Sequence, residues 1–290
     1  MRYRLLAMDL DGTAIVDGQM PTAAVQRAVA RAQACGVQVV VATGRPYQSA
    51  RRYADALGVT APVICFQGAV VKELGPAQAT LWADPLPQEP LAELIAFAET
   101  RELDLTLYSE RAIYIAAMYR PESFYEQWFG LTLRRVKRLA DALAEMRGEG
   151  LVPLKALFIG EPAANDRLFV ELRERFAGRR SSSEDRLAIV RSHAFFVEAT
   201  SPHASKGNAL AFIAQHLGIS QAETIAVGDS GNDLSMVEWA GLGVAMANAS
   251  PDLLAAADWV APPVHEDGIA AVIELWISPA HGLSPFDQAP

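Results

Sequence analysis

The chain has 290 residues, of which 51% are hydrophobic and 20% charged, so it is long enough for two modules or one large α/β unit with a packed core. Its net charge of -9 argues against a nucleic-acid or anionic-membrane partner, because those surfaces recruit clustered Lys and Arg. The two cysteines, Cys35 and Cys65, cannot build a disulfide framework, and no apolar run reaches the ~18 residues of a bilayer-spanning helix. We expect no leader segment before the first strand, and a cytoplasmic location.

Strands and helices alternate along the first 81 residues. The predicted elements are a strand ending at Leu10, a helix over 21–34, a strand over 38–42, a helix over 47–57, a strand over 62–66, and a hairpin with strands over 69–74 and 79–82. Pro21 suits the first turn of its helix, since an amide hydrogen there has no intrahelical partner. The alternation is typical of right-handed βαβ crossovers and predicts a parallel sheet.

The pattern changes after three closely spaced prolines, Pro85, Pro87 and Pro90. The predicted elements of this middle segment are helices over 91–101, 138–147 and 165–176, and short strands over 103–108, 113–117, 154–159, 187–190 and 195–198. Short strands interspersed with helices indicate a separate antiparallel α+β module.

The alternating pattern returns from Thr200. Its predicted elements are strands over 224–227, 242–245 and 259–260, helices over 208–217 and 269–277, and helices that start near Asn232 and Pro251. The sequence therefore predicts an α/β fold in which residues 1–81 and 198–290 form a parallel-sheet core. Residues 82–197 form an inserted α+β domain.

Two aspartates, Asp9 and Asp11, stand where the first strand ends and a turn with Gly12 begins. In open parallel sheets, ligands bind at the carboxyl ends of the strands. Burying two like charges is costly unless a cation lies between them, so the pair favours a hard divalent cation such as Mg²⁺. Taken alone, the same residues also fit a solvated turn. An EF-hand loop is excluded, because it needs glycine at its sixth position and Gly12 is the fourth residue.

Three further segments place polar groups at strand ends or helix starts. Thr43 and Gly44 follow the second strand, Lys206 opens a helix, and residues 228–233 follow a later strand with Asp229 as their first acid. Each has a structural alternative: Thr43 as a helix cap, Lys206 as a surface residue and Asp229 as a turn residue. Together they supply a hydroxyl, a cation and a second acidic cluster, which favours one common site.

The complete segments are Asp9-Leu10-Asp11-Gly12-Thr13, Thr43-Gly44-Arg45, Lys206-Gly207, and Gly228-Asp229-Ser230-Gly231-Asn232-Asp233 followed by Gly243-Val244-Ala245-Met246-Ala247-Asn248-Ala249. These segments resemble the four motifs of haloacid dehalogenase superfamily phosphatases of the Cof-type subfamily, over a span from Tyr3 to about Ile277. One departure is Gln67-Gly68, where relatives usually have Asn-Gly. The resemblance implies a Rossmann-like core with an inserted C2 cap domain.

The resemblance also implies roles for the acidic residues. Asp9 would be the nucleophile that forms an aspartyl-phosphate, and Asp11 the general acid and then the general base. Mg²⁺ would be held by the Asp9 carboxylate, the Asp11 backbone carbonyl and Asp229. Asp233 would hydrogen-bond a metal-bound water.

Five groups would hold the phosphoryl oxygens. They are the Leu10 amide, Thr43, the Gly44 amide, Lys206 and Asn232. Asn232 also fits a simple helix cap. Six side chains are left open between a substrate contact and a structural role: His203, Arg45 and Tyr47, and, in the cap, Tyr108, Tyr114 and Trp128.

These residues together predict a Mg²⁺-dependent phosphatase for small phosphate monoesters such as sugar phosphates, nucleotides or cofactor phosphates. A phosphomutase or phosphotransferase on the same scaffold is the enzymatic alternative. A non-catalytic regulatory protein that binds phosphate and metal would lack a motif residue, and none is missing. A P-loop kinase is excluded because no Gly-x-x-x-x-Gly-Lys-Ser/Thr segment occurs. Neither the particular substrate nor the oligomeric state follows from the sequence.

Overall fold

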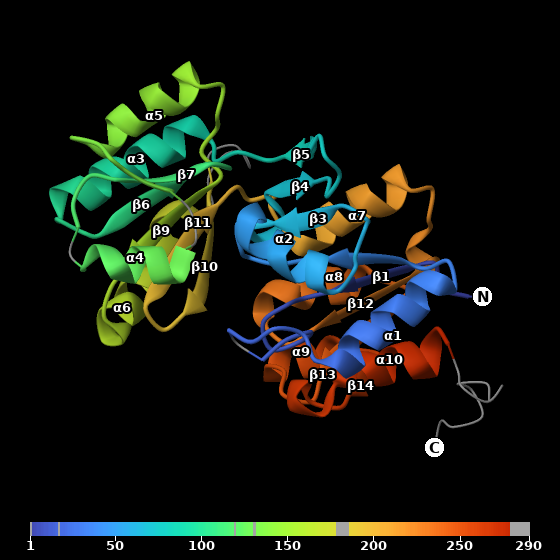
Figure 1. Cartoon of the computed structure of the whole chain (residues 1–290). Helices are drawn as coiled ribbons and strands as arrows, with labels where there is room; N and C mark the ends of the chain where they lie inside the picture. The colour runs from blue at the N-terminus through green and yellow to red at the C-terminus, as the bar shows by residue number, and fades with distance from the viewer. Residues whose placement is uncertain (1, 17, 119, 130–131, 178–185, 279–290) are drawn as a thin grey trace. The chain divides into compact units, whose positions relative to one another are not determined.

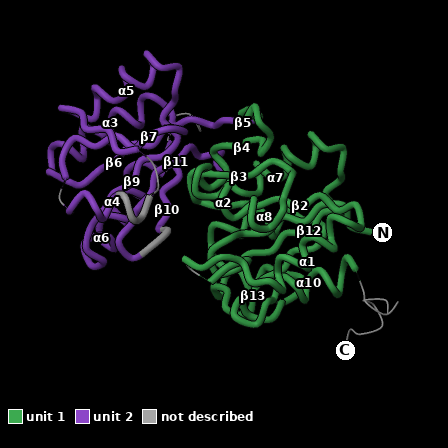
Figure 2. Tube along the Cα trace, viewed as in Figure 1, with its two compact units in different colours: residues 1–81, 205–290 green, residues 82–204 purple. Residues whose placement is uncertain are grey.

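The computed structural model describes residues 2–16, 18–118, 120–129, 132–177 and 186–278. The chain divides into two compact units, residues 1–81 with 205–290 (unit 1) and residues 82–204 (unit 2) (Figure 2). Unit 2 ends later than the expected return at 197/198. The reason is strand β11 (Phe196–Thr200), which continues through that point and pairs with strands of unit 2.

Unit 1 contains a five-stranded parallel sheet, as the alternation predicted (Figure 1). Its strands, in spatial order, are β14 (Trp259–Ala261), β13 (Leu242–Met246), β12 (Thr224–Gly228), β1 (Leu5–Met8) and β2 (Gln38–Val41). Met8 is in register with Val41 on one side and with Val227 on the other. Strands β1, β2 and β12 therefore end at the same level, and the loops that follow them share one edge of the sheet.

Helices cover both faces of this sheet. They are α1 (Ala23–Ala34), α2 (Tyr47–Ala56), α7 (Lys206–His216), α8 (Leu234–Trp239), α9 (Pro251–Ala256) and α10 (Gly268–Trp276). Helix α1 packs with α10 on one face, and α7 packs with α8 on the other (Figure 1). The expected start of the first helix is wrong by two residues: Thr22 caps α1 by accepting the Val25 amide at 3.2 Å, and Pro21 precedes the cap.

A small three-stranded sheet extends unit 1 beyond β2. It consists of β3 (Val63–Cys65), β4 (Val70–Lys72) and β5 (Thr80–Ala83), and β4 and β5 form the predicted hairpin. Strand β3 lies beside the end of β2, since Ala42 and Ile64 form a parallel bridge. The turn after β3 is thereby brought to the loop after β2.

Unit 2 has a six-stranded, mainly antiparallel sheet. Its strands, in spatial order, are β10 (Ala188–His193), β11, β9 (Lys155–Ile159), β6 (Leu105–Tyr108), β7 (Ala112–Ile115) and β8 (Thr132–Arg135). Its helices are α3 (Gln88–Thr100), α4 (Glu122–Phe129), α5 (Leu139–Gly148) and α6 (Pro162–Leu172). The sequence analysis predicted neither α4 nor β8. Strand β8 carries two arginines, and its two outer residues are exposed while its two inner residues are half-buried.

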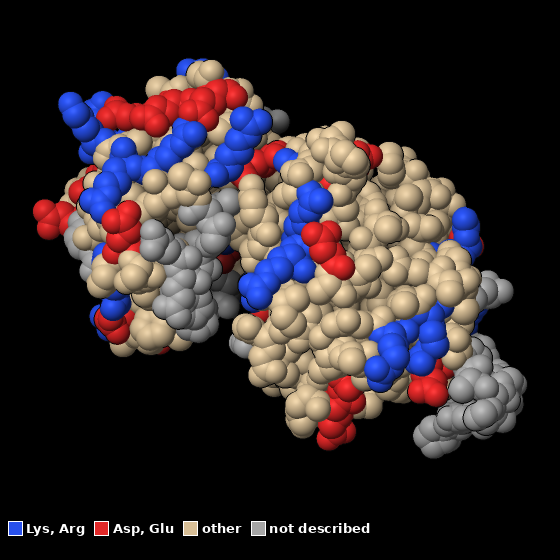
Figure 3. Space-filling view, viewed as in Figure 1, with Lys and Arg blue, Asp and Glu red and all other residues tan. Residues whose placement is uncertain are grey.

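The hydrophobic core of unit 2 lies on one face of this sheet, where Leu107, Phe158 and Val197 pack with side chains of α3, α5 and α6. The alternate residues of the same strands point to the other face and include a buried ion pair, Lys155 Nζ to Glu198 Oε1 at 3.3 Å. On the surface, basic side chains lie beside acidic ones (Figure 3). Among the described residues, none of the helices is both long and apolar enough to cross a membrane.

Candidate active site

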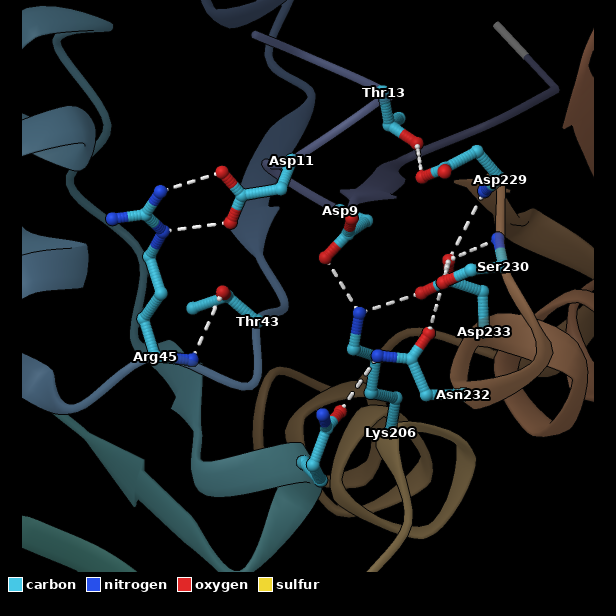
Figure 4. Close-up of polar contacts among 11 residues, drawn as sticks. Asp9, Asp11, Thr13, Thr43, Arg45, Lys206, Asp229, Ser230, Asn232 and Asp233 are labelled. Carbon is cyan, nitrogen blue, oxygen red and sulfur yellow. Dashed lines mark hydrogen bonds and ion pairs between the residues drawn. The ribbon is translucent and has the colours of Figure 1, made fainter. Parts of the chain in front are cut away.

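The loops after β1, β2 and β12 carry the predicted motif residues at one edge of the unit 1 sheet (Figure 4). Asp9 follows β1 directly, and its backbone amide donates to the Val227 carbonyl at 3.0 Å, which fixes the loop after β1 against β12. Lys206, the first residue of α7, reaches the same point. The structure thus gathers side chains that are far apart in the sequence.

Lys206 is fully buried between two carboxylates. Its Nζ donates to Asp9 Oδ1 at 2.5 Å and to Asp233 Oδ1 at 2.6 Å. Burial alone would lower the pKa of Lys206, but the charges of Asp233 and Asp9 outweigh it and raise that pKa above its usual value. Lys206 is therefore a permanent cation at the centre of the site.

Helix α7 approaches α8 closely at the residue after the lysine. A Cβ on Gly207 would overlap the Ser235 carbonyl, and the Gly207 amide donates to Ser235 Oγ at 3.0 Å. Only glycine permits this approach, which brings the start of α7, and with it Lys206, to the acidic residues. Gly207 thus lets α7 come close enough for Lys206 to reach the two carboxylates.

Three carboxylates, from Asp9, Asp229 and Asp233, place oxygen atoms within 4.8 Å of one another. The pKa of Asp9 is well above its usual value, and burial is the largest cause. The positive charge of Lys206 lowers this pKa, while the negative charges of Asp233 and Asp229 raise it. A divalent cation at this cluster would relieve the repulsion, and carboxylate oxygens are the ligands that Mg²⁺ and Ca²⁺ prefer. The acidic cluster can therefore bind a divalent metal ion.

Asp233 also shapes the loop that carries Asp229. Its Oδ2 accepts the amides of Asp229 and Ser230, both at 3.0 Å, while its Oδ1 accepts Lys206. Asp233 has no exposed surface. Asp233 therefore links Lys206 to the turn that carries Asp229. The sequence predicted only a contact of Asp233 with a metal-bound water.

The first and last motifs also meet at Gly12 and Asp229. Thr13 Oγ1 donates to Asp229 Oδ1 at 2.8 Å, and Gly12 has a φ of 81° with its α-carbon against the Asp229 carboxylate. A Cβ at Gly12 would overlap that carboxylate, and the positive φ would strain the backbone of any other residue at this position. Asn248, from the segment that trails the last motif, donates to the Gly12 carbonyl at 2.9 Å. These contacts hold the turn after β1 in place.

Asp11 is paired with Arg45. Arg45 Nε donates to Asp11 Oδ2 at 2.6 Å and a terminal nitrogen donates to Asp11 Oδ1 at 2.5 Å, a bidentate arrangement (Figure 4). The Arg45 amide donates to Thr43 Oγ1 at 3.1 Å, so Thr43 is held at the start of its loop. The sequence left Arg45 open between a crevice and a surface role, and the structure places it on the side chain of Asp11.

Asn232 does not act as a helix cap. Its Nδ2 donates to Gln67 Oε1 at 2.9 Å, and its Oδ1 accepts from Ser230 Oγ at 2.5 Å. Gln67 lies in the turn after β3 and is buried. The sequence marked Gln67 as a departure from the family pattern that put a substrate contact of its loop in doubt, and it did not predict the contact with Asn232 that joins Gln67 to the site.

The remaining candidates lie elsewhere. Tyr47 is buried in α2 and its hydroxyl donates to the Glu73 carbonyl at 2.9 Å, which ties the helix to the end of β4. His203 is exposed in a turn of unit 2. Tyr114 is buried in the core of unit 2, and Tyr108 is buried on the opposite face of its sheet. The side chain of Trp128 lies outside the described part of the structure.

Several known proteins match nearly the whole chain. The haloacid dehalogenase-like hydrolase family matches residues 6–273. YxeH of Bacillus subtilis is 32% identical over 275 residues, 93% of this chain and 97% of its own length. Phosphatase YwpJ of the same organism is 30% identical over 284 residues, 93% of this chain and 99% of its own. A solved structure of a haloacid dehalogenase-like hydrolase from B. subtilis has a TM-score of 0.78 at 25% identity and covers 97% of this chain and 100% of that chain.

The protein therefore belongs to the haloacid dehalogenase-like hydrolases. It is an enzyme of the phosphatase class, the activity for which its relatives are named. The resemblance of the four motifs to this superfamily is confirmed, as is the α/β class of the fold.

Proposed function

We propose that the protein is a Mg²⁺-dependent phosphatase that hydrolyses small phosphate monoesters through an aspartyl-phosphate on Asp9. The observation that carries the proposal is the buried contact of Lys206 with Asp9, next to the carboxylates of Asp229 and Asp233. A nucleophile, a fixed cation and an acidic cluster at one strand end are the groups that phosphoryl transfer needs.

In the first half-reaction, a carboxylate oxygen of Asp9 bonds to phosphorus while the bond from phosphorus to the leaving oxygen breaks. Asp11 gives its proton to that oxygen, after its side chain turns away from Arg45. In the second half-reaction, Asp11 takes a proton from water, whose oxygen attacks phosphorus. Inorganic phosphate leaves, and the Asp9 carboxylate is restored.

The Asp9 and Asp229 carboxylates and the Asp11 backbone carbonyl would hold Mg²⁺. When bound, the ion would neutralise phosphoryl oxygens and the Asp9 charge. The donor set fits, because all of its groups are hard oxygens. Burial, together with the charges of Asp233 and Asp229, raises the pKa of Asp9, and a bound cation would favour its ionised form.

The transferred phosphoryl group would be held by donors of unit 1 alone. Lys206 and Asn232 lie on one side of Asp9 and Thr43 on the other (Figure 4). The amides of Leu10 and Gly44 complete the proposed set. These donors would stabilise the charge that spreads over the phosphoryl oxygens in the transition state.

Unit 2 would select the leaving group, because all of the motif residues lie in unit 1. The substrate class we propose is a small phosphorylated metabolite. YcsE of B. subtilis, which is 26% identical over 278 residues, is named as a 5-amino-6-(5-phospho-D-ribitylamino)uracil phosphatase. A substrate panel should therefore combine sugar phosphates, nucleotides, cofactor phosphates and this pyrimidine ribityl phosphate.

The test is release of inorganic phosphate from that panel by the purified chain, with and without Mg²⁺. We expect hydrolysis, with ¹⁸O from labelled water in the inorganic phosphate. Transfer of the phosphoryl group to a sugar hydroxyl, without release, would identify a phosphomutase instead. Binding of phosphate without either reaction would identify a regulatory protein.

A further inference from the structure

Gln67 lies between the loop of Thr43 and the loop of Asn232. Its backbone amide donates to the Thr43 carbonyl at 3.2 Å, and the backbone amide of Phe66 donates to the Arg45 carbonyl at 3.2 Å. The turn after β3 is therefore fastened to the Thr43 loop through its backbone. The side chain of Gln67 extends from this turn to the other loop.

The backbone of Gln67 has a conformation that glutamine seldom adopts. Its φ is 61° and its ψ 22°, in the left-handed region, and Phe66 before it has a φ of 51°. Such strain persists where the surroundings enforce it, and it is frequent at functional sites. Here the conformation keeps the side chain buried with 7% exposure and in contact with Asn232.

The amide of Gln67 selects the orientation of the Asn232 amide. Gln67 Oε1 can only accept, so Asn232 must present Nδ2 to it, and Ser230 Oγ donates to the oxygen on the other side. Asn232 Nδ2 carries a second hydrogen, which remains for another acceptor. The amide of Gln67 is also packed tightly on Gly44, where a Cβ would overlap Gln67 Nε2.

We propose that Gln67 is a positioning residue that holds Asn232 with its second Nδ2 hydrogen directed to the phosphoryl group. The inference rests on the proposed function only in the identity of the ligand. Gln67 joins two segments of the site, the Thr43 loop through its backbone and the Asn232 loop through its side chain. Loss of the Gln67 side-chain amide should release Asn232, while the backbone hydrogen bond of Gln67 still holds the Thr43 loop.

The experiment is a double-mutant cycle with Gln67→Met and Asn232→Ala, read by the Kd of inorganic phosphate in calorimetry and by kcat and KM for p-nitrophenyl phosphate. We expect Gln67→Met to weaken phosphate binding about fivefold, the size expected for one lost hydrogen bond. In the Asn232→Ala background, the same change should have less than about a twofold effect, because its partner is absent.

Two further variants separate positioning from folding. Gln67→Gly suits the left-handed backbone and removes the same amide, so it should stay folded and reproduce the fivefold loss. Gln78→Met makes the identical change at another left-handed glutamine, φ 46°, on an exposed turn, and should leave phosphate binding unchanged.

Equal losses for Gln67→Met in both backgrounds, or unchanged phosphate binding in Gln67→Gly, would overturn the inference. A wild-type chain that binds phosphate but hydrolyses no monoester would refute the proposed function, and the cycle in Kd would still decide the role of Gln67. A wild-type chain that neither binds phosphate nor hydrolyses a monoester would refute both.

Discussion

Lys206 Nζ lies 2.5 Å from Asp9 Oδ1, although the two residues are 197 positions apart in the chain. Lys206 belongs to the segment after unit 2, and Asp9 to the segment before it. The candidate site therefore forms only when both segments of unit 1 have folded together.

Replacing Lys206 with methionine should destabilise the protein and slow the hydrolysis of every substrate by a similar factor. Asp9 and Asp233 would remain as buried carboxylates without their cation, which costs about 3–5 kcal/mol of unfolding free energy. Urea unfolding in metal-free buffer measures this loss, and Lys137→Met, at an exposed lysine, is the matched control. The drop in kcat/KM should be similar for three chemically different phosphates, since all present the same phosphoryl group. Strong discrimination among them would contradict a role on the phosphoryl group.

Asp9→Asn should abolish turnover while the fold is kept. An amide is not a nucleophile for phosphorus, so kcat should fall below about a hundredth of the wild-type value. Circular dichroism and thermal unfolding check the fold, and Asp55→Asn, at an exposed carboxylate on α2, controls for loss of a negative charge. Retention of more activity than this would remove Asp9 from the mechanism.

Asp11→Asn should matter most for poor leaving groups. An alkoxide needs a proton from Asp11 as it departs, whereas p-nitrophenolate does not, so kcat should fall further for alkyl phosphates than for p-nitrophenyl phosphate. The ratio of the two losses is the measurement. An equal loss for both substrates would show that Asp11 does not protonate the leaving group.

Mg²⁺ should stabilise the protein, and more strongly as pH rises. The folded-state pKa of Asp9 is raised, so between its usual value and the raised value the native state binds more protons than the unfolded state. Stability without metal therefore falls as pH rises through this range. Mg²⁺ binds the ionised carboxylate and reverses the loss, which a pH series of melting temperatures with Mg²⁺ or chelator would show.

Asp229→Ala is the matched variant for the metal prediction. It removes a proposed ligand from the acidic cluster, so the Mg²⁺-dependent rise in melting temperature should shrink strongly. Ca²⁺ should support hydrolysis poorly, because its coordination is larger and looser. Full hydrolysis in excess chelator would disprove the requirement for a metal.

Much of the fold and the assembly of the site could be predicted because both depend on patterns along the chain. Apolar runs and turns located the strands, and parallel strands that end in register bring Asp9, Thr43 and Asp229 to one edge. Strand β8 was missed, since the segment Thr132–Arg135 has little apolar alternation and takes its place by pairing with β7. Tertiary pairing overrode local pattern at this point.

The side-chain partners within the site could not be predicted in the same way. The contacts of Arg45 with Asp11 and of Gln67 with Asn232 join residues 34 and 165 positions apart. A guanidinium or an amide has many possible partners in a sequence, and only the packed loops decide between them. The predicted role of Asp233 was incomplete for the same reason, because its bond to Lys206 depends on the close approach of α7.

The order of strands in unit 1 has a consequence for synthesis on the ribosome. Strand β1 is made first, and its permanent neighbour β12 is made only after the whole of unit 2. Unit 2 is one continuous stretch and can fold while the nascent chain still lacks β12, since domains fold as units during translation. Until then, one edge of β1 has unpaired backbone groups and is open to wrong pairing with other chains. The last third of the chain thus closes an exposed sheet edge in the same step that delivers Lys206 to Asp9.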